Sequence, residues 1–305
     1  MTPADRVLKL SKNPLIVKDL RTRLRGMKAY ILISAHLVAL GLAVAVVFLV
    51  SQSTLSGSGN LQERRFLGKA IFGLLVWLEL VMISFVAPAL TSGSVSLERE
   101  RQTFDLLRVT LISSRQIVLG KFLPGLTFVC LLLLTSVPMQ GPAFLLGGVL
   151  WQEILIATLI LLVTTAAFCA FGLLLSCLIR RTLISTTLAY ATTIFVVFGV
   201  PVMSLLALLL FGTRFPMGFD ALSASTIRVL LTIAWSVISL TPVGAMIGTE
   251  VILLDQQNLI RAEITVGRGI TFVTVSPWIP YVIAYLLISL LFLWLSEQLL
   301  SRPEK

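Results

Sequence analysis

Long apolar runs alternate with short polar connections along most of this chain. Six runs lie at about 29–51, 69–91, 121–147, 154–179, 182–211 and 278–297. A helix needs about 20 apolar residues to cross a bilayer core of roughly 30 Å, and each run is long enough. Backbone N–H and C=O groups in lipid must be hydrogen-bonded within their own segment, so such runs adopt helices. The pattern predicts an all-α integral membrane protein, built as a six-helix transmembrane bundle in a single domain, 1–305.

A different periodicity precedes the first apolar run, over residues 14–28. Ile16, Leu20 and Leu24 recur every four residues and share one helical face, whereas Lys18 and Arg21 belong to a basic stripe on another. A basic amphipathic helix directly before a membrane span is typical of an interfacial element. We therefore predict an N-terminal helix that lies along the membrane surface.

The polar connection at 92–120 carries a dense charged segment, Ser96-Leu97-Glu98-Arg99-Glu100-Arg101-Gln102-Thr103-Phe104-Asp105-Leu106-Leu107. In a helix, its apolar residues Leu97, Phe104 and Leu107 would fall within one arc, with charged residues along the flank. Ser113 and Gln116 then have the spacing of a capping box at the start of the next helix. The connection is therefore predicted to contain two short helices joined near 111–113.

The region 212–277 does not fit a simple span. Its apolar pieces at 227–240 and 243–254 are separated by Thr241-Pro242, and each is shorter than a crossing requires. The pattern favours a pair of re-entrant or interfacial helices on the extracytoplasmic side, before the last span. A single kinked span over 227–254 is the alternative.

Charge distribution indicates the orientation of the chain in the membrane. The sequence is 57% hydrophobic and 12% charged, with a net charge of +10. With the N-terminus in the cytoplasm, 17 Lys and Arg residues fall on the cytoplasmic side and 7 on the other. This positive-inside bias predicts a multi-pass protein of the cytoplasmic (inner) cell membrane with both termini cytoplasmic. We therefore interpret the basic residues as determinants of topology and as contacts for anionic lipids, not as a nucleic-acid binding surface.

Motifs of catalysis and cofactor binding are missing from the sequence. It contains no G-x-x-x-x-G-K-[ST] phosphate loop, no H-E-x-x-H, no G-x-S-x-G and no Cys/His metal spacing. Cys130, Cys169 and Cys177 all fall within predicted spans, where they are interpreted as packing residues. We predict no catalytic, cofactor or metal site, and therefore a protein that is not an enzyme.

Glu79 is the one acid clearly within a predicted span, and the only histidine, His36, lies inside the first span. An ionised carboxylate such as that of Glu79 costs free energy at membrane depth. Glu79 therefore either contacts a proton or substrate, or makes a protonated or hydrogen-bonded contact between helices. His36 has no carboxylate near it in the sequence, which favours a packed polar residue over a ligand or base. Glu79 is the candidate intramembrane polar site.

The order of these segments resembles the membrane permease subunits of ABC-2 type transporters. The resemblance rests on Pro-Ala-Leu-Thr-Ser-Gly-Ser-Val-Ser at the end of the second span, the charged segment after it, and Ser-Ser-Arg-Gln-Ile-Val-Leu-Gly-Lys beyond. It implies that 14–28 is an elbow helix and that 92–120 carries a cytoplasmic coupling helix. The residues it assigns to contact with a separate P-loop ATPase are Glu98, Arg99, Glu100, Arg101, Thr103 and Asp105.

Three functional hypotheses follow. The first is the permease subunit of an ABC exporter, paired with itself or with a similar permease and using ATP bound and hydrolysed by partner subunits. The second is a non-transporting membrane anchor or scaffold for a cytosolic ATPase. The third, less favoured, is a membrane-embedded lipid-modifying enzyme that would use Glu79 or His36.

Overall fold

The computed structural model describes residues 26–51, 61–104, 113–206, 232, 235–256, 260–266 and 270–301. Positions 14–25 of the predicted interfacial helix (14–28) therefore lie outside the described residues. The chain forms two compact units, one comprising Met1–Ala191 with Ile288–Lys305 and the other Thr192–Leu287.

Within the described residues, six helical stretches are long and apolar enough to cross a membrane. They are Ala29–Val50, Leu61–Glu100, Ser114–Leu145, Trp151–Leu178, Thr182–Leu206 and Trp278–Ser301. Each coincides with one of the runs predicted from the sequence. The chain is a multi-pass membrane protein.

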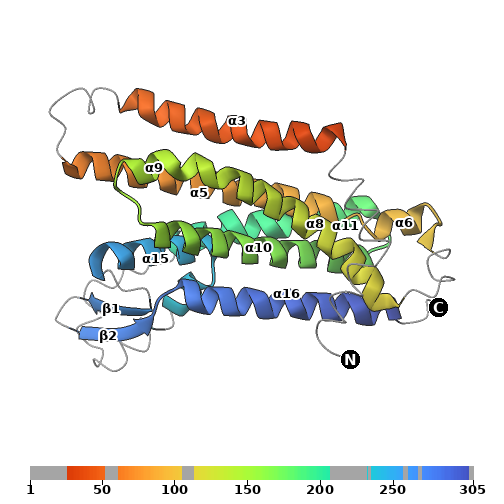
Figure 1. Ribbon diagram of the computed structural model, residues 1–305. Helices are drawn as coiled ribbons and strands as arrows, with labels where there is room; N and C mark the ends of the chain where they lie inside the picture. The colour runs from red at the N-terminus through yellow and green to blue at the C-terminus, as the bar shows by residue number, and fades with distance from the viewer. Residues whose placement is uncertain are drawn as a thin grey trace, which may run out of the picture. The chain divides into compact units, whose positions relative to one another are not determined.

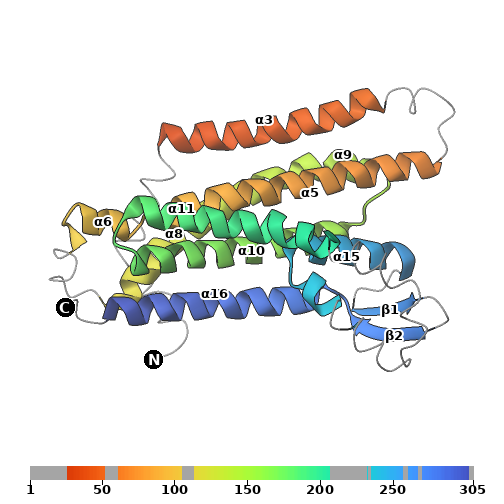
Figure 2. The same cartoon turned by 180° about the vertical axis from the view of Figure 1, so that it is seen from behind.

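Three helices form the centre of the first unit: α5 (Leu61–Thr91), α8 (Ser114–Ser136) and α10 (Trp151–Leu178). They pack side by side, as Figures 1 and 2 show from opposite sides. Helix α3 (Met27–Val50) also contacts α5 and α8, but only 11% of its apolar window is buried. It therefore presents a narrow stripe to the bundle, whereas α5, α8 and α10 supply most of the core.

Short helical segments complete this unit. A 3₁₀ turn, η1 (Val137–Gln140), and α9 (Gly141–Leu145) follow α8, and α6 (Ser96–Glu100) follows α5. The unit also contains the beginning of α11 (Thr182–Ile194) and the end of α16 (Trp278–Ser301). At the start of α8, the predicted capping box is confirmed: the Gln116 N–H donates to Ser113 Oγ at 3.4 Å, and the Ser113 N–H to Gln116 Oε1 at 3.1 Å.

The end of α5 approaches α10 closely at Gly172. A Cβ at this position would collide with the Thr91 hydroxyl and lie 3.3 Å from the Ser92 nitrogen. The Thr91 hydroxyl donates to the Ala87 carbonyl at 3.0 Å, so it cannot move aside without losing that hydrogen bond. A residue without a side chain fits here because Thr91 and Ser92 lie directly against the backbone of α10.

Replacing Gly172 with alanine is expected to lower the free energy of unfolding by about 1–3 kcal/mol, as overpacking does in cores. The matched control is Gly73→Ala on α5, where an added Cβ meets nothing within 4 Å. That substitution should leave stability equal or raise it by up to about 1 kcal/mol, because alanine favours helix over glycine. Thermal unfolding of both variants in detergent is the measurement, and equal melting temperatures would contradict the assigned contact.

The second unit contains the remainder of the fifth helical run. A π-helical turn, η2, covers Phe195–Gly199, and Pro201 follows it closely. Proline has no N–H and cannot donate to the preceding turn, and π-turns commonly absorb such a mismatch. The helix therefore changes its type locally just before Pro201.

The same unit contains α15 (Pro242–Gln256), which corresponds to the second member of the predicted helical pair. The Thr241 hydroxyl caps it by accepting the Gly244 N–H at 3.0 Å, and Pro242 occupies its first turn. The first helix of the predicted pair covers 227–240. Within it, the described residues 232 and 235–239 are helical. At 15 residues, α15 is shorter than a membrane crossing requires.

A β-hairpin that the sequence analysis did not predict follows α15. Strand β1 (Arg261–Val266) pairs antiparallel with β2 (Ile270–Val275), with Arg261 opposite Val275 and Val266 opposite Ile270. The strands are rich in β-branched Ile, Val and Thr, which favour extended structure. The expectation of a purely α-helical fold is therefore wrong for this segment.

Candidate functional site

The charged segment begins where α5 ends, and its first turn is capped by a neighbouring helix. The chain leaves α5 at Thr91, turns, and forms α6 over Ser96–Glu100. Val95 precedes α6 and has no polar side chain to serve as a cap. The Ser176 hydroxyl on α10 instead accepts the N–H groups of Val95 at 2.8 Å and of Ser96 at 3.0 Å. These N–H groups at the start of a helix would otherwise lack hydrogen-bond partners, and their bonds to Ser176 fix the start of α6 to α10.

Glu98 connects α6 to α8 by an ion pair with Lys121. The Glu98 side chain is 21% exposed and that of Lys121 is 10% exposed, so both charges are largely removed from solvent. An unpaired charge in such a place is strongly destabilising. This pair therefore holds the two elements together.

Arg99 connects α6 to the C-terminal end of α10. Its Nη1 donates to the Cys177 carbonyl at 2.7 Å, where the negative end of the helix dipole favours a cation. The guanidinium also lies 5.2 Å from the centre of the buried Phe104 ring, within the range of a cation–π contact. Arg99 thus brings together α6, α10 and the chain that follows α6.

Glu100 connects α6 to the start of α11. One carboxylate oxygen accepts the Thr182 N–H at 2.8 Å and the other accepts the Thr182 hydroxyl at 2.7 Å. An acid at a helix N-terminus satisfies a free N–H and complements the helix dipole. The side-chain bond from Thr182, followed by its backbone bond, lowers the pKa of the Glu100 carboxyl below its ordinary value.

This contact should depend on pH. Because the folded-state pKa of Glu100 is lowered, its stabilisation is complete above the ordinary carboxyl pKa and is lost as pH falls through the lowered value. Hydrogen exchange at the Thr182 amide should therefore lose protection on acidification in the wild type. The Glu100→Gln variant should show no such step, and identical pH profiles in the two proteins would refute the contact.

A second group of residues, in α6 and directly after it, faces away from the bundle. Leu97, Arg101, Gln102 and Thr103 are all exposed. The chain reverses direction after α6: Gln102 has a left-handed backbone with φ of 58°, and the Thr103 N–H returns to the Glu98 carbonyl at 3.0 Å. We call these four exposed residues the outward surface of α6.

The predicted form of the charged segment is corrected in one respect. The helix is only five residues long, and Leu97 and Phe104 do not share an apolar face: Leu97 is 39% exposed and Phe104 is 3% exposed. The turn at Gln102 places them on different sides. Asp105, the last of the assigned contact residues, lies outside the described residues.

The other five assigned residues divide into two groups. Glu98, Arg99 and Glu100 contact α8, α10 and α11 of their own chain, whereas Arg101 and Thr103 belong to the outward surface of α6. The sequence pattern did not distinguish these groups. The inward partners Lys121, Ser176 and Thr182 were also not identified, because they come from distant parts of the chain.

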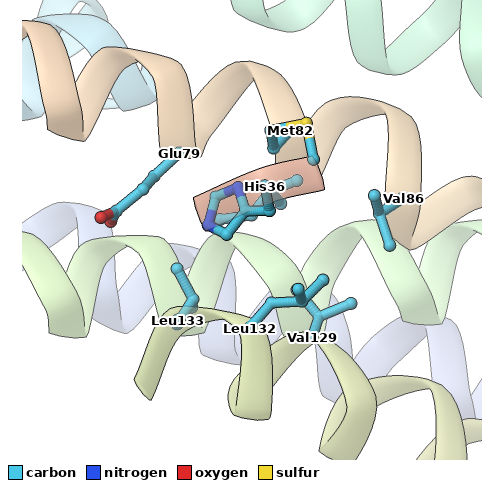
Figure 3. Close-up of a pocket in the computed structure, with 8 residues that line it drawn as sticks. His36, Glu79, Met82, Val86, Val129, Leu132 and Leu133 are labelled. Atoms are coloured by element: carbon cyan, nitrogen blue, oxygen red, sulfur yellow. The ribbon is translucent and has the colours of Figure 1, made fainter. Parts of the chain in front are cut away.

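The membrane interior contains a polar cluster separate from α6. Glu79 on α5 is 2% exposed, and the Gln140 side-chain amide donates to its Oε1 at 3.3 Å. His36 on α3 is also 2% exposed, and it lines the same small cavity as Glu79 (Figure 3). The positions of the two residues along the chain do not reveal that they share a cavity, although ionisable groups within spans often face one.

No family model matches the sequence, and no curated protein matches it.

Proposed function

We propose that this chain is the permease subunit of an ABC-2 type transporter, coupled through α6 to a separate P-loop ATPase. The observation that carries the proposal is the arrangement of α6. Its inward side is fixed to three helices of its own chain, and its other side, the outward surface of α6, is exposed.

Such an arrangement suits the transmission of force from a partner into the membrane. A displacement of α6 would act on α8 through Glu98 and Lys121, on α10 through Arg99 and Ser176, and on α11 through Glu100. Packed helices transmit motion as rigid elements between alternative arrangements. A push on this one short helix would therefore reach three helices that are long enough to cross the membrane.

The sequence supports a partner that supplies the energy. It has no phosphate-binding loop, so ATP hydrolysis would occur in another subunit. The excess of basic residues on one side of the proposed topology supports a cytoplasmic location for α6 and both termini. We further propose that two permease chains, identical or similar, act with two ATPase subunits in export.

The test uses the full chain co-expressed with the P-loop ATPase encoded nearest to its gene. The wild-type permease is expected to co-purify with the ATPase in detergent, and a Glu98→Ala, Glu100→Ala variant is expected to lose coupled transport because α6 is released from α8 and α11. Assembly and transport that are unchanged in this variant would count decisively against the proposal.

A further inference from the structure

The connection between α9 and α10 lies directly against the first turns of α5. A Cβ at Gly148 would collide with the Arg65 carbonyl oxygen and lie 2.9 Å from the Lys69 nitrogen. A Cβ at Gly68 would lie 2.8 Å from the Ala143 carbonyl oxygen. The atoms in the way belong to the backbone, which cannot rotate aside as a flexible side chain can. Close approach through small residues is also what stabilises helix contacts in lipid, where no hydrophobic effect drives helices together.

An ion pair joins α5 to α10 beside these glycines. Lys69 Nζ lies 3.7 Å from Glu153 Oε1, and the two side chains are 22% and 3% exposed. The other Glu153 oxygen, Oε2, accepts the Leu150 N–H at 3.3 Å and so caps the start of α10. A charge this deeply buried is strongly destabilising when its opposite charge is removed. We call Gly68, Lys69, Gly148 and Glu153 the α5–α10 clasp.

The opposite ends of the same two helices are joined as well. Thr91 and Ser92 lie against the backbone of α10 at Gly172, and the Ser176 hydroxyl accepts two N–H groups at the start of α6. A helix rises 1.5 Å per residue, so Lys69 and Thr91 lie about 33 Å apart along α5. This separation is close to the thickness of the hydrocarbon core of a bilayer. The two helices are therefore joined at both ends of a membrane crossing (Figures 1 and 2).

Between these ends the two helices are packed over much of their length, unlike α3. In the helical stretches that contain α5 and α10, 56% and 61% of the apolar window is buried, against 11% for α3. Separating closely packed surfaces opens voids and removes their van der Waals contacts. A shift of α3 would remove few such contacts. We therefore expect α5 and α10 to resist separation from each other much more than α3 resists separation from them.

We infer that α5 and α10 move as one clamped body and that Lys69 and Glu153 are positioning residues at the end of this body opposite α6. A shift of α10 along α5 would drive backbone against backbone at Gly148 and pull the buried ion pair apart. The clamping follows from these contacts alone, whereas its role in transport rests on the proposed function. A displacement of α6 would pass to α10 through Ser176 and Arg99, and the clamped pair would carry it across the membrane. Rearrangement during transport then takes place around α5 and α10, not between them.

The distance between the two helices at the clasp end is directly measurable. Phe66 on α5 and Leu155 on α10 are both exposed and can carry spin labels on genetically encoded p-acetylphenylalanine, which leaves the three cysteines untouched. Double electron–electron resonance on the full-length protein in nanodiscs should give one narrow distance distribution. Gly148→Ala should broaden or shift it. The matched control Gly73→Ala should not, because an added Cβ there meets nothing within 4 Å.

Addition of the partner ATPase and ATP should move the centre of the wild-type distribution by no more than about 2 Å, the size of a small helix shift. A larger shift, or a wild-type distribution as broad as that of Gly148→Ala, would overturn the clamping. If Gly148→Ala does not fold, Lys69→Met takes its place in this comparison. If the ATPase does not bind the wild type, the proposed function fails, and the distributions without nucleotide still decide the clamping.

ATP hydrolysis tests the positioning residues separately. Lys69→Met should bind the ATPase with wild-type affinity, because α6 is unchanged, but lose most of the permease-dependent change in hydrolysis rate. Lys69→Arg keeps a positive charge opposite Glu153 and should retain that change. A purely structural role would reduce the amount of folded permease without altering the rate per bound permease. Wild-type rates in Lys69→Met, or an equal loss in Lys69→Arg, would overturn the assignment.

Discussion

A Leu97→Asp, Arg101→Glu variant is expected to lose binding of the partner ATPase while the permease itself remains folded. Both side chains belong to the outward surface of α6 and are exposed, so their replacement should change the free energy of unfolding by less than about 0.5 kcal/mol. An interface centred on them should lose at least about 2 kcal/mol, or roughly 30-fold in affinity. The measurement is titration of the purified ATPase onto permease in nanodiscs.

The control for this variant is Arg115→Glu, which makes the same charge change as the Arg101→Glu substitution at an exposed position in the first turn of α8. It should weaken binding by no more than a few-fold, because it lies outside the outward surface of α6. An equal loss in both proteins would mean that general charge, and not α6, determines binding. Unchanged affinity in the α6 variant would place the contact elsewhere.

Glu98→Ala is expected to destabilise the permease by about 3 kcal/mol, because it removes the carboxylate that is paired with the largely buried Lys121. The same substitution should reduce the coupling of ATP hydrolysis to transport, since α6 would lose its connection to α8. Unfolding of the variant in detergent gives the first quantity, and transport per ATP in vesicles gives the second.

A second substitution separates loss of the ion pair from general damage. In the Glu98→Ala, Lys121→Met protein no charge is left unpaired, so most of the lost stability should return. Coupling should not return, because the connection between α6 and α8 is still missing. If the double variant is as unstable as the single one, the pair seen between Glu98 and Lys121 is not what holds α6.

The elements that were predictable from sequence are those set by local patterns. The spans follow from the length of apolar runs, which lipid makes decisive. The capping box at Ser113 and Gln116 follows from a spacing of three residues and is confirmed by both hydrogen bonds. The hairpin at 261–275 was also locally encoded, by β-branched runs on either side of Gly267, but no element was predicted between the helical pair that ends at 254 and the last span.

The elements that sequence reasoning could not supply depend on contacts between distant segments. The charged residues of α6 were recognised, but whether each faces inward or outward depends on Lys121, Ser176 and Thr182. No spacing along the chain relates these partners to α6. The same holds for His36 and Glu79, which share a cavity only because α3 packs against α5.

The most direct test of the proposed function is ATP hydrolysis by the partner ATPase in vesicles, measured with wild-type permease, with the Leu97→Asp, Arg101→Glu variant, and without permease. We predict that wild-type permease changes the rate of hydrolysis severalfold and that the variant behaves as if no permease were present. A rate that is the same in all three samples would contradict the assignment of α6 as the site where this chain receives energy from an ATPase.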